Sequence, residues 1–198
     1  QFRLHGQRAG DGDALPLPPG ELVGIAVDGV GGQTHGVQHL ADARALVEAS
    51  ALTTDDRAAQ WLRDNVADTG IRIIAAGSGL RKAKRYGSFF AQEVETYDSL
   101  AAAVSARAKK SDEIKIVLTG IIDFENGVVK GEPQFTLAET QDIVTTAHDF
   151  GLRVFAHCSG LDGLRIAVNA GVDSIEHGFF MNQEILEVMA AKKMAWTP

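Results

Sequence analysis

Two histidines in the sequence each stand at the end of a short apolar run, and a helix-like stretch separates them. His157 ends "LRVFAH" and His177 ends "VDSIEH". Imidazole is the most common protein ligand for zinc and similar metals, so rings from two neighbouring strands could bind one ion. The alternative is that each histidine hydrogen-bonds a loop carbonyl where its strand ends. One such histidine would favour this alternative, but two in consecutive strand-helix units favour the metal site.

Lys115 lies inside another apolar run, "EIKIVLTG". Burying an unpaired ammonium is costly, so the pKa of a buried lysine falls until the amine is neutral. A neutral amine can react with carbon dioxide to give a carbamate, an anionic oxygen ligand that can bridge two divalent metals. The alternative is a lysine whose stem lies along the strand while its ammonium reaches water. For Lys115 taken alone, this alternative is the simpler interpretation.

A basic stretch, "RKAKRYG", occupies residues 81–87 after a predicted strand. An arginine here could bind a substrate carboxylate, because the guanidinium matches the geometry of that group. Tyr86 could hydrogen-bond a substrate carbonyl. We therefore take Arg85 and Tyr86 as candidate substrate-binding residues. The alternative is a solvated basic loop whose charges contribute little.

A glycine-rich stretch and the single cysteine are weaker indications of function. Residues 28–32, "DGVGG", resemble a phosphate-cradling loop but lack the lysine that follows in such loops. With the basic stretch, they define an alternative function, a phosphate-handling α/β enzyme, which leaves Lys115 and both histidines unexplained. Cys158 follows His157 and is expected to pack on the opposite side of its strand.

Short β-branched runs alternate with longer helix-periodic stretches from residue 70 onward. The pattern predicts strands at 71–77, 114–120, 153–158, 173–178 and 193–198. It predicts helices at 136–151, 161–171 and 182–193, because these stretches carry capping residues, glycine ends or basic ends typical of helices. Upstream, it predicts strands at 21–32 and 51–56, helices at 39–50 and 57–70, and an irregular lead-in at 1–20.

This alternation is typical of βα units with a parallel sheet, so we predict an α/β fold. The seven strand candidates favour a (β/α)8 TIM-type barrel that residues 21–198 supply in most part but not completely. In such a barrel the carboxyl ends of the strands converge on one face. Side chains at the ends of different strands therefore meet there.

The composition is that of an ordinary globular chain of 198 residues with a formal net charge of −7. The acidic balance argues against a nucleic-acid partner, which would require a basic stripe. No apolar run approaches the roughly 20 residues that cross a bilayer, and no signal-peptide pattern begins the chain. One cysteine cannot form an internal disulfide. We expect a cytoplasmic protein that binds neither membranes nor nucleic acids.

Residues 114–198, with "IKIVLTG", "RVFAHCSG" and "DSIEHG", resemble the amidohydrolase superfamily, in particular its prolidase-like and imidazolonepropionase-related hydrolases. Residues 37–113 resemble it more weakly. The resemblance implies that Lys115 is a carboxylated bridging lysine, formed with carbon dioxide, and that His157 and His177 are metal ligands. It implies two divalent ions, zinc or else manganese, cobalt or iron. It further implies hydrolysis of an amide, peptide or related acyl bond of a small-molecule or dipeptide-like substrate by a metal-activated water. Assembly into a homo-oligomer is compatible with the sequence.

The sequence departs from the family pattern at several positions. It contains no His-x-His pair, its first predicted strand offers Asp28 instead, and no aspartate of an eighth strand follows Pro198. Ser159 stands where the family often has a second histidine. Either the chain is a fragment of a longer enzyme, which the ends of the sequence favour, or it is a non-catalytic barrel that acts in binding or assembly.

Overall fold

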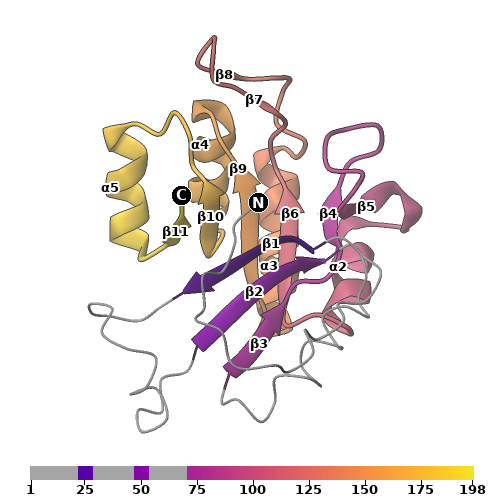
Figure 1. Ribbon diagram of the computed structural model, residues 1–198. Coiled ribbons are helices and arrows are strands. Elements are labelled where there is room, and N and C mark those ends of the chain that lie inside the picture. Colours follow the sequence, from indigo (N-terminus) through magenta and orange to yellow (C-terminus); the bar gives the residue numbers. More distant parts are fainter. Residues whose placement is uncertain (1–21, 29–46, 54–70) are drawn as a thin grey trace, which may run out of the picture.

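The computed structural model describes residues 22–28, 47–53 and 71–198, with side chains from residue 74 onward. Its main element is a six-stranded sheet in the order β11-β10-β9-β6-β4-β5, in which every neighbouring pair is parallel (Figure 1). The strands are β4 (Gly79–Arg81), β5 (Ala91–Glu93), β6 (Glu113–Val117), β9 (Arg153–Cys158), β10 (Ser174–His177) and β11 (Ala195–Thr197). The parallel α/β fold predicted from the sequence is confirmed.

Helices connect these strands and cover one face of the sheet. They are α2 (Leu100–Ala108), α3 (Leu137–Asp149), α4 (Leu161–Ala170) and α5 (Gln183–Lys192), and a 3-10 turn spans Val94–Thr96. The predicted helices at 136–151, 161–171 and 182–193 are confirmed. Thr136 and Glu139 form the capping box that begins α3, and Gly171 ends α4 in the left-handed conformation.

The core lies between this helical layer and one face of the sheet. Alternate strand residues supply it, such as Ile114 and Ile116 from β6 and Val154 and Ala156 from β9. Because side chains alternate along a strand, the residues between them point to the other face. This second face of the sheet carries Lys115 and His157.

The N-terminal part of the described chain differs from the prediction. Strands β1 (Leu22–Asp28), β2 (Val47–Thr53) and β3 (Ile71–Ala75) form a separate sheet, in which β1 and β2 are antiparallel. The helix predicted at 39–50 is wrong at 47–50, where β2 begins, and the strand predicted at 51–56 starts earlier. The segment "VEASALT" alternates apolar and polar residues at its start, which suits a strand that pairs on both edges.

The predicted strand at 71–77 is β3, which pairs with β2 rather than with the six-stranded sheet. The next strand, β4, takes the place beside β6. Two hydrogen bonds tie the end of β3 to Asp112, just before β6: the Ala75 amide donates to Asp112 Oδ2, and the Asp112 backbone amide donates to the Ala75 carbonyl, both at 2.9 Å. The predicted helix at 57–70 and the lead-in at 1–20 lie outside the described residues.

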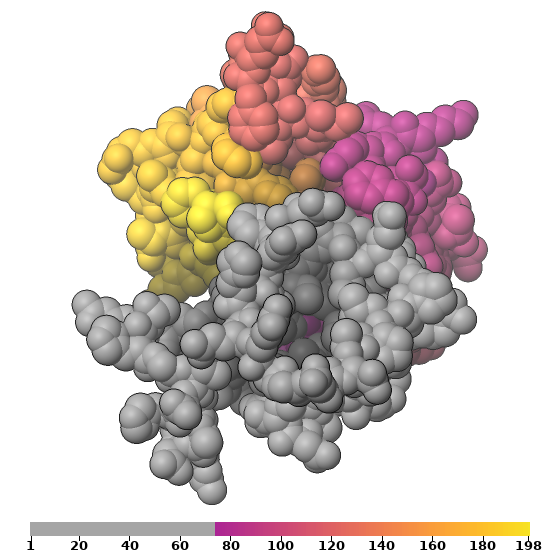
Figure 2. Space-filling model, viewed as in Figure 1, coloured from indigo at the N-terminus to yellow at the C-terminus, as the bar shows by residue number. Residues whose placement is uncertain are grey.

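A β-hairpin that the sequence did not indicate follows β6. Its strands, β7 (Ile122–Asp123) and β8 (Val128–Val129), pair antiparallel. The hairpin stands out beyond the sheet in Figure 1 and forms the projection at the top of the surface in Figure 2. Within the part of the chain that the structure describes, no helix combines the length and the apolar character needed to cross a membrane.

Candidate functional site

Lys115 lies at the centre of β6, and its side chain is 1% exposed. Its ammonium forms an ion pair with the Glu176 carboxylate, in an arrangement that lacks the geometry of a hydrogen bond. Burial lowers the pKa of Lys115 to about 7, against the opposing effect of the Glu113 charge. The amine is therefore partly neutral near neutral pH.

His157 lies on β9, on the same face of the sheet as Lys115. The Gly120 backbone lies close to its ring and acts to raise the pKa of His157. Burial lowers the pKa of His157 to about 3, and the charges of His177 and Lys115 add to this effect. The ring is therefore neutral throughout the physiological range, with a lone pair on one nitrogen.

His177 ends β10, and its backbone departs from strand geometry. Strict alternation would place its side chain with Ile175, on the helical side of the sheet. Instead, His177 has φ 68° and Gly178 follows with φ 65°, both in the left-handed region. Few residues other than glycine adopt this conformation, and doing so at a strand end is a feature of functional sites. The His177 carbonyl accepts a hydrogen bond of 3.1 Å from Trp196 Nε1.

The two histidine rings consequently face each other. Their centroids are 4.7 Å apart, with the ring planes at 74°. Burial lowers the pKa of His177, and the Lys115 charge acts in the same direction. The structure thus brings together the three residues that the sequence singled out from three different strands.

Aromatic side chains surround this pair of rings. The Tyr86 ring centroid lies 5.4 Å from that of His157, and the Phe90 centroid lies 6.2 Å from it. The Phe179 ring lies parallel to His177 at 6.4 Å. Tyr86 is therefore in contact with the site, whereas the adjacent Arg85 is not among the residues that touch the histidines.

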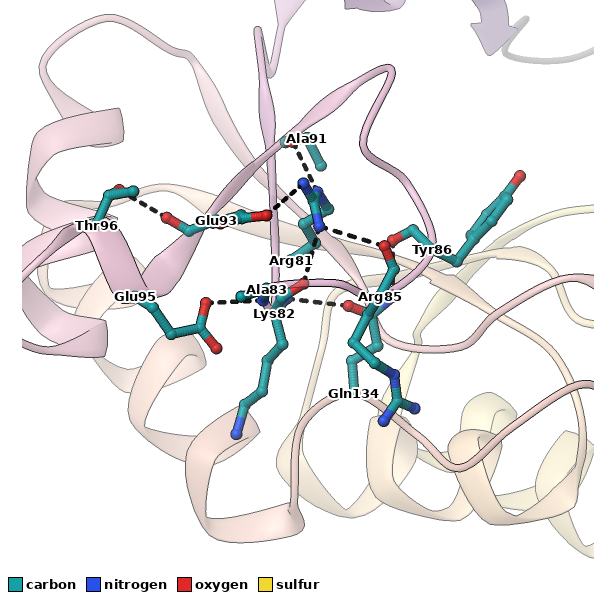
Figure 3. A network of polar contacts seen from close by, with 10 residues as sticks. All are labelled: Arg81, Lys82, Ala83, Arg85, Tyr86, Ala91, Glu93, Glu95, Thr96 and Gln134. Carbon is teal, nitrogen blue, oxygen red and sulfur yellow. Dashed lines mark hydrogen bonds and ion pairs between the residues drawn. The ribbon is translucent and has the colours of Figure 1, made fainter.

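Most of the basic stretch is engaged within the protein (Figure 3). Arg81 is buried, pairs with Glu93 at 2.8 Å, and donates to the carbonyls of neighbouring loop residues. Lys82 pairs with Glu139 of α3. These two cations are structural, so the interpretation of the stretch as a carboxylate site applies only to its remaining members. Arg85 is exposed and donates to the Glu132 carbonyl.

The side chains of the site can be compared with the ligands that a divalent metal requires. Among the described residues, no group of three or more His, Cys, Asp and Glu side chains is arranged to hold an ion. What converges is two neutral imidazoles and one buried amine. The donor set fits a divalent metal if Lys115 is carboxylated, because the carbamate then adds oxygen to the two nitrogen donors.

Two residues of the site were missed by the sequence analysis. Glu176 contacts Lys115, and a signal for it existed, since alternation along "DSIEH" places Glu176 on the face opposite Ile175. Gln134 is buried and bonds to the loop that carries Tyr86. It lies outside any periodic segment, so nothing in the sequence pointed to it.

Known proteins resemble this chain in sequence and in fold. The amidohydrolase family profile matches residues 37–196. The chain belongs to the amidohydrolase family. This confirms the resemblance found in the sequence. An uncharacterised protein of Mycobacterium tuberculosis, Rv2915c, and its Mycobacterium bovis counterpart, Mb2939c, are each 35% identical to this chain over 127 residues, 64% of this chain and 34% of the relative.

Solved structures of several hydrolases resemble this chain. A Xaa-Pro dipeptidase with bound methionine is 34% identical, with a TM-score of 0.57 over 71% of this chain and 39% of the other. A putative prolidase from Bifidobacterium longum is 26% identical, with a TM-score of 0.52 over 66% and 32%. Ochratoxinase from A. niger, at 19% identity and a TM-score of 0.55 over 70% and 38%, shares the fold. The chain spans about a third of the length of the curated relatives it matches. The fold is thus part of a TIM-type barrel.

Proposed function

We propose that the protein is a metal-dependent hydrolase of an amide, peptide or related acyl bond, with Lys115, His157 and His177 as metal ligands. The observation that carries the proposal is the meeting of two histidine rings, 4.7 Å apart between centroids, with a buried lysine amine beside them. Family membership supports the same class of reaction. We propose two zinc ions, with manganese, cobalt and iron as alternatives that accept the same donors.

A divalent metal bound at these residues would supply Lewis acidity at the scissile carbonyl and lower the pKa of the water that attacks it. His157 is ready for such an ion, because its low pKa keeps the ring neutral. The nearby Gly120 carbonyl can accept a hydrogen bond from one ring nitrogen, which would orient the ring and leave the other nitrogen for the ion. His177 is oriented by its left-handed backbone and by the bond from Trp196 to its carbonyl.

Lys115 becomes an oxygen ligand only after carboxylation. Its partly neutral amine can attack carbon dioxide, which forms a nitrogen-carbon bond and releases one proton. The product is an anionic carbamate with two oxygens at the end of a long stem. Such a group suits a position between two cations, and the burial of Lys115 favours it by disfavouring the competing ammonium.

The substrate we propose is a small or dipeptide-like molecule, with Tyr86 hydrogen-bonding its carbonyl and Arg85 near its far end. The contact of Tyr86 with His157 supports this placement. The similarity to a Xaa-Pro dipeptidase at 34% identity supports the substrate class. The cytoplasmic location and assembly into homo-oligomers stay predictions.

Hydrolysis by the purified chain tests the proposal. The chain, supplied with zinc and bicarbonate, is assayed for amine release from a panel of dipeptides and N-acyl amino acids. We expect hydrolysis that a chelator removes and zinc restores, and that Lys115→Met lowers by more than about 100-fold. Lys109→Met, at the exposed end of α2, serves as the matched control and should leave the rate unchanged. Hydrolysis that survives both chelation and Lys115→Met would contradict the proposal.

A further inference from the structure

A cavity of about 190 Å³ lies beside the candidate metal ligands. Two of its lining residues also lie close to His157: the Tyr86 ring, whose centroid is 5.4 Å from that of His157, and the Gly120 backbone, which affects the pKa of His157. The rest of its wall comes from the loop after β4 and from both ends of the hairpin, namely Arg85, Ile121, Lys130, Gly131, Glu132 and Gln134. Only a residue of the cavity wall, such as Tyr86, therefore lies between the cavity and His157.

Buried contacts hold the walls of the cavity in place. The Gln134 side chain is shared between two backbone groups of the loop after β4: its Nε2 donates to the Tyr86 carbonyl, and its Oε1 accepts from the Lys82 amide, both at 3.0 Å. Figure 3 shows Gln134 against this loop. A hydrogen bond of 2.7 Å from the backbone N–H of Gln134 to the Leu118 carbonyl ties the same residue to the end of β6.

The hairpin closes the other side through a close approach of backbones. A Cβ atom at Gly120 would lie 2.6 Å from the Lys130 carbonyl oxygen, so only glycine permits this packing. The Lys130 amide donates to the Ile121 carbonyl at 2.8 Å. This close approach and this hydrogen bond together fix the backbone of Lys130 and so the point from which its side chain extends.

The charges that line the cavity are two cations, Arg85 and Lys130, and one carboxylate, Glu132. Arg85 donates from one nitrogen to the Glu132 carbonyl, and a guanidinium has further N–H donors. Lys130 is 3.4 Å from Asp123, but its side chain is 65% exposed, and such an ion pair is weak. Asp123 also accepts two hydrogen bonds from Asn126. Both cations can therefore also bind an anionic ligand.

We propose that this cavity binds the carboxylate of the substrate, with Arg85 and Lys130 as its ligands and Gln134 as the residue that positions the Tyr86 loop. The inference rests on the proposed function, because it places the scissile carbonyl at the histidines and the carboxylate beyond Tyr86. The substrates are then amides that carry a free carboxylate, such as N-acyl amino acids and dipeptides. Capped amides and esters are excluded as good substrates, because they leave both cations without a counter-charge.

The test uses a pair of probes that differ only in the carboxylate and resist hydrolysis: N-methanesulfonyl-L-methionine and its carboxamide. Their dissociation constants are measured by calorimetry on the full chain, with zinc and after chelation. We expect the acid to bind about 10- to 100-fold more tightly than the carboxamide, as for a charge-assisted contact. Lys130→Met and Arg85→Met should each remove most of this preference, because acid binding weakens more than carboxamide binding.

Lys84→Met is the matched control, since Lys84 is an exposed cation of the same loop that does not line the cavity. It should preserve the preference, and unchanged melting temperatures show that all variants are folded. Equal binding of acid and carboxamide, no binding of either, or an equal loss in Lys84→Met would overturn the inference. Failure of the proposed function looks different: the acid preference then persists, while the chain holds no zinc and Lys115→Met changes nothing.

Discussion

At the scale of the residue, the site is defined by groups held in unfavourable states. Lys115 is a buried amine, with its pKa lowered to about 7 by burial, and His177 is a non-glycine residue with φ 68°. Each costs stability of the fold. Such costs are typical of positions where the chemistry, rather than the packing, determines the residue.

The Lys115 amine adds a pH-dependent term to the stability of the metal-free protein. Its pKa is about 7 in the folded protein, against 10.5 for an ordinary lysine. Between these values the unfolded chain binds a proton that the folded chain lacks. The free energy of unfolding therefore rises with pH in this window, by up to about 1.4 kcal/mol per pH unit. Below it, both states are protonated and the cost of burying the charge is complete.

Lys115→Met removes this term and keeps most of the side-chain volume. The difference in the free energy of unfolding, variant minus wild type, should be constant below about pH 7 and fall steadily toward about pH 10. Urea unfolding in chelator and carbon dioxide-free buffer measures it. Lys109→Met, an exposed lysine, should show a difference that is flat with pH. A flat difference for Lys115→Met as well would show that Lys115 is an ordinary, water-exposed lysine.

The three proposed metal ligands could be selected from the sequence because each interrupts or ends an apolar strand. Alternation along β6 and β9 and the convergence of parallel strand ends then bring them together. The left-handed turn at His177 and the place of Gln134 could not be predicted. Both depend on contacts made by residues distant in the sequence, Trp196 to His177 and Tyr86 to Gln134.

At the scale of the element, helix α4 packs closely on the strand ends that carry the site. Gly163 in its first turn leaves no room for a side chain, because a Cβ there would overlap the Thr119 methyl group and lie 3.1 Å from Cys158 Sγ. Thr119 in turn accepts a hydrogen bond of 2.9 Å from the Ser159 amide, next to the strand of His157. The helix and the end of β9 are thus fixed through one threonine.

Gly163→Ala should lower the free energy of unfolding by about 1–3 kcal/mol, because overpacking forces the helix or Thr119 to shift. Thr119→Ser in the same chain removes the methyl group and keeps the hydroxyl, so the double variant should recover most of the loss. Chemical denaturation of both single variants and the double variant measures this coupling. Additive losses in the double variant would mean that α4 does not approach Thr119 as closely as described.

Elements with local signals could be predicted, and those defined by their partners could not. The capping box of α3, the asparagine cap of α5 and the glycine end of α4 mark helices within a few residues of their observed ends. Strands β4 and β5 and the hairpin strands are only two or three residues long. Segments this short carry no readable period and are strands only because a neighbour pairs with them. Strand β2 is longer, at seven residues, but it too is paired with neighbours on both edges, and the helix predicted at 39–50 overlaps its start.

At the scale of the whole molecule, the described chain forms part of a barrel with the site at the carboxyl end of its sheet. His177 ends β10, His157 is the last but one residue of β9, and Lys115 lies on the neighbouring strand β6. The hairpin after β6 and the loop after β4 stand at the same end and build the cavity proposed for the substrate carboxylate. This is the end at which barrel enzymes carry their active sites.

The central claim is that Lys115, His157 and His177 bind a divalent metal, and metal content tests it most directly. The chain is purified after incubation with zinc and bicarbonate, and zinc per chain is measured by elemental mass spectrometry. His148→Ala is the matched control, because His148 is an exposed histidine that pairs with Asp173 outside the site. We predict near-stoichiometric zinc in wild type and His148→Ala, and a loss of most of it in His157→Ala, His177→Ala and Lys115→Met. Zinc content that is the same in all five proteins, or absent from wild type, would contradict the account.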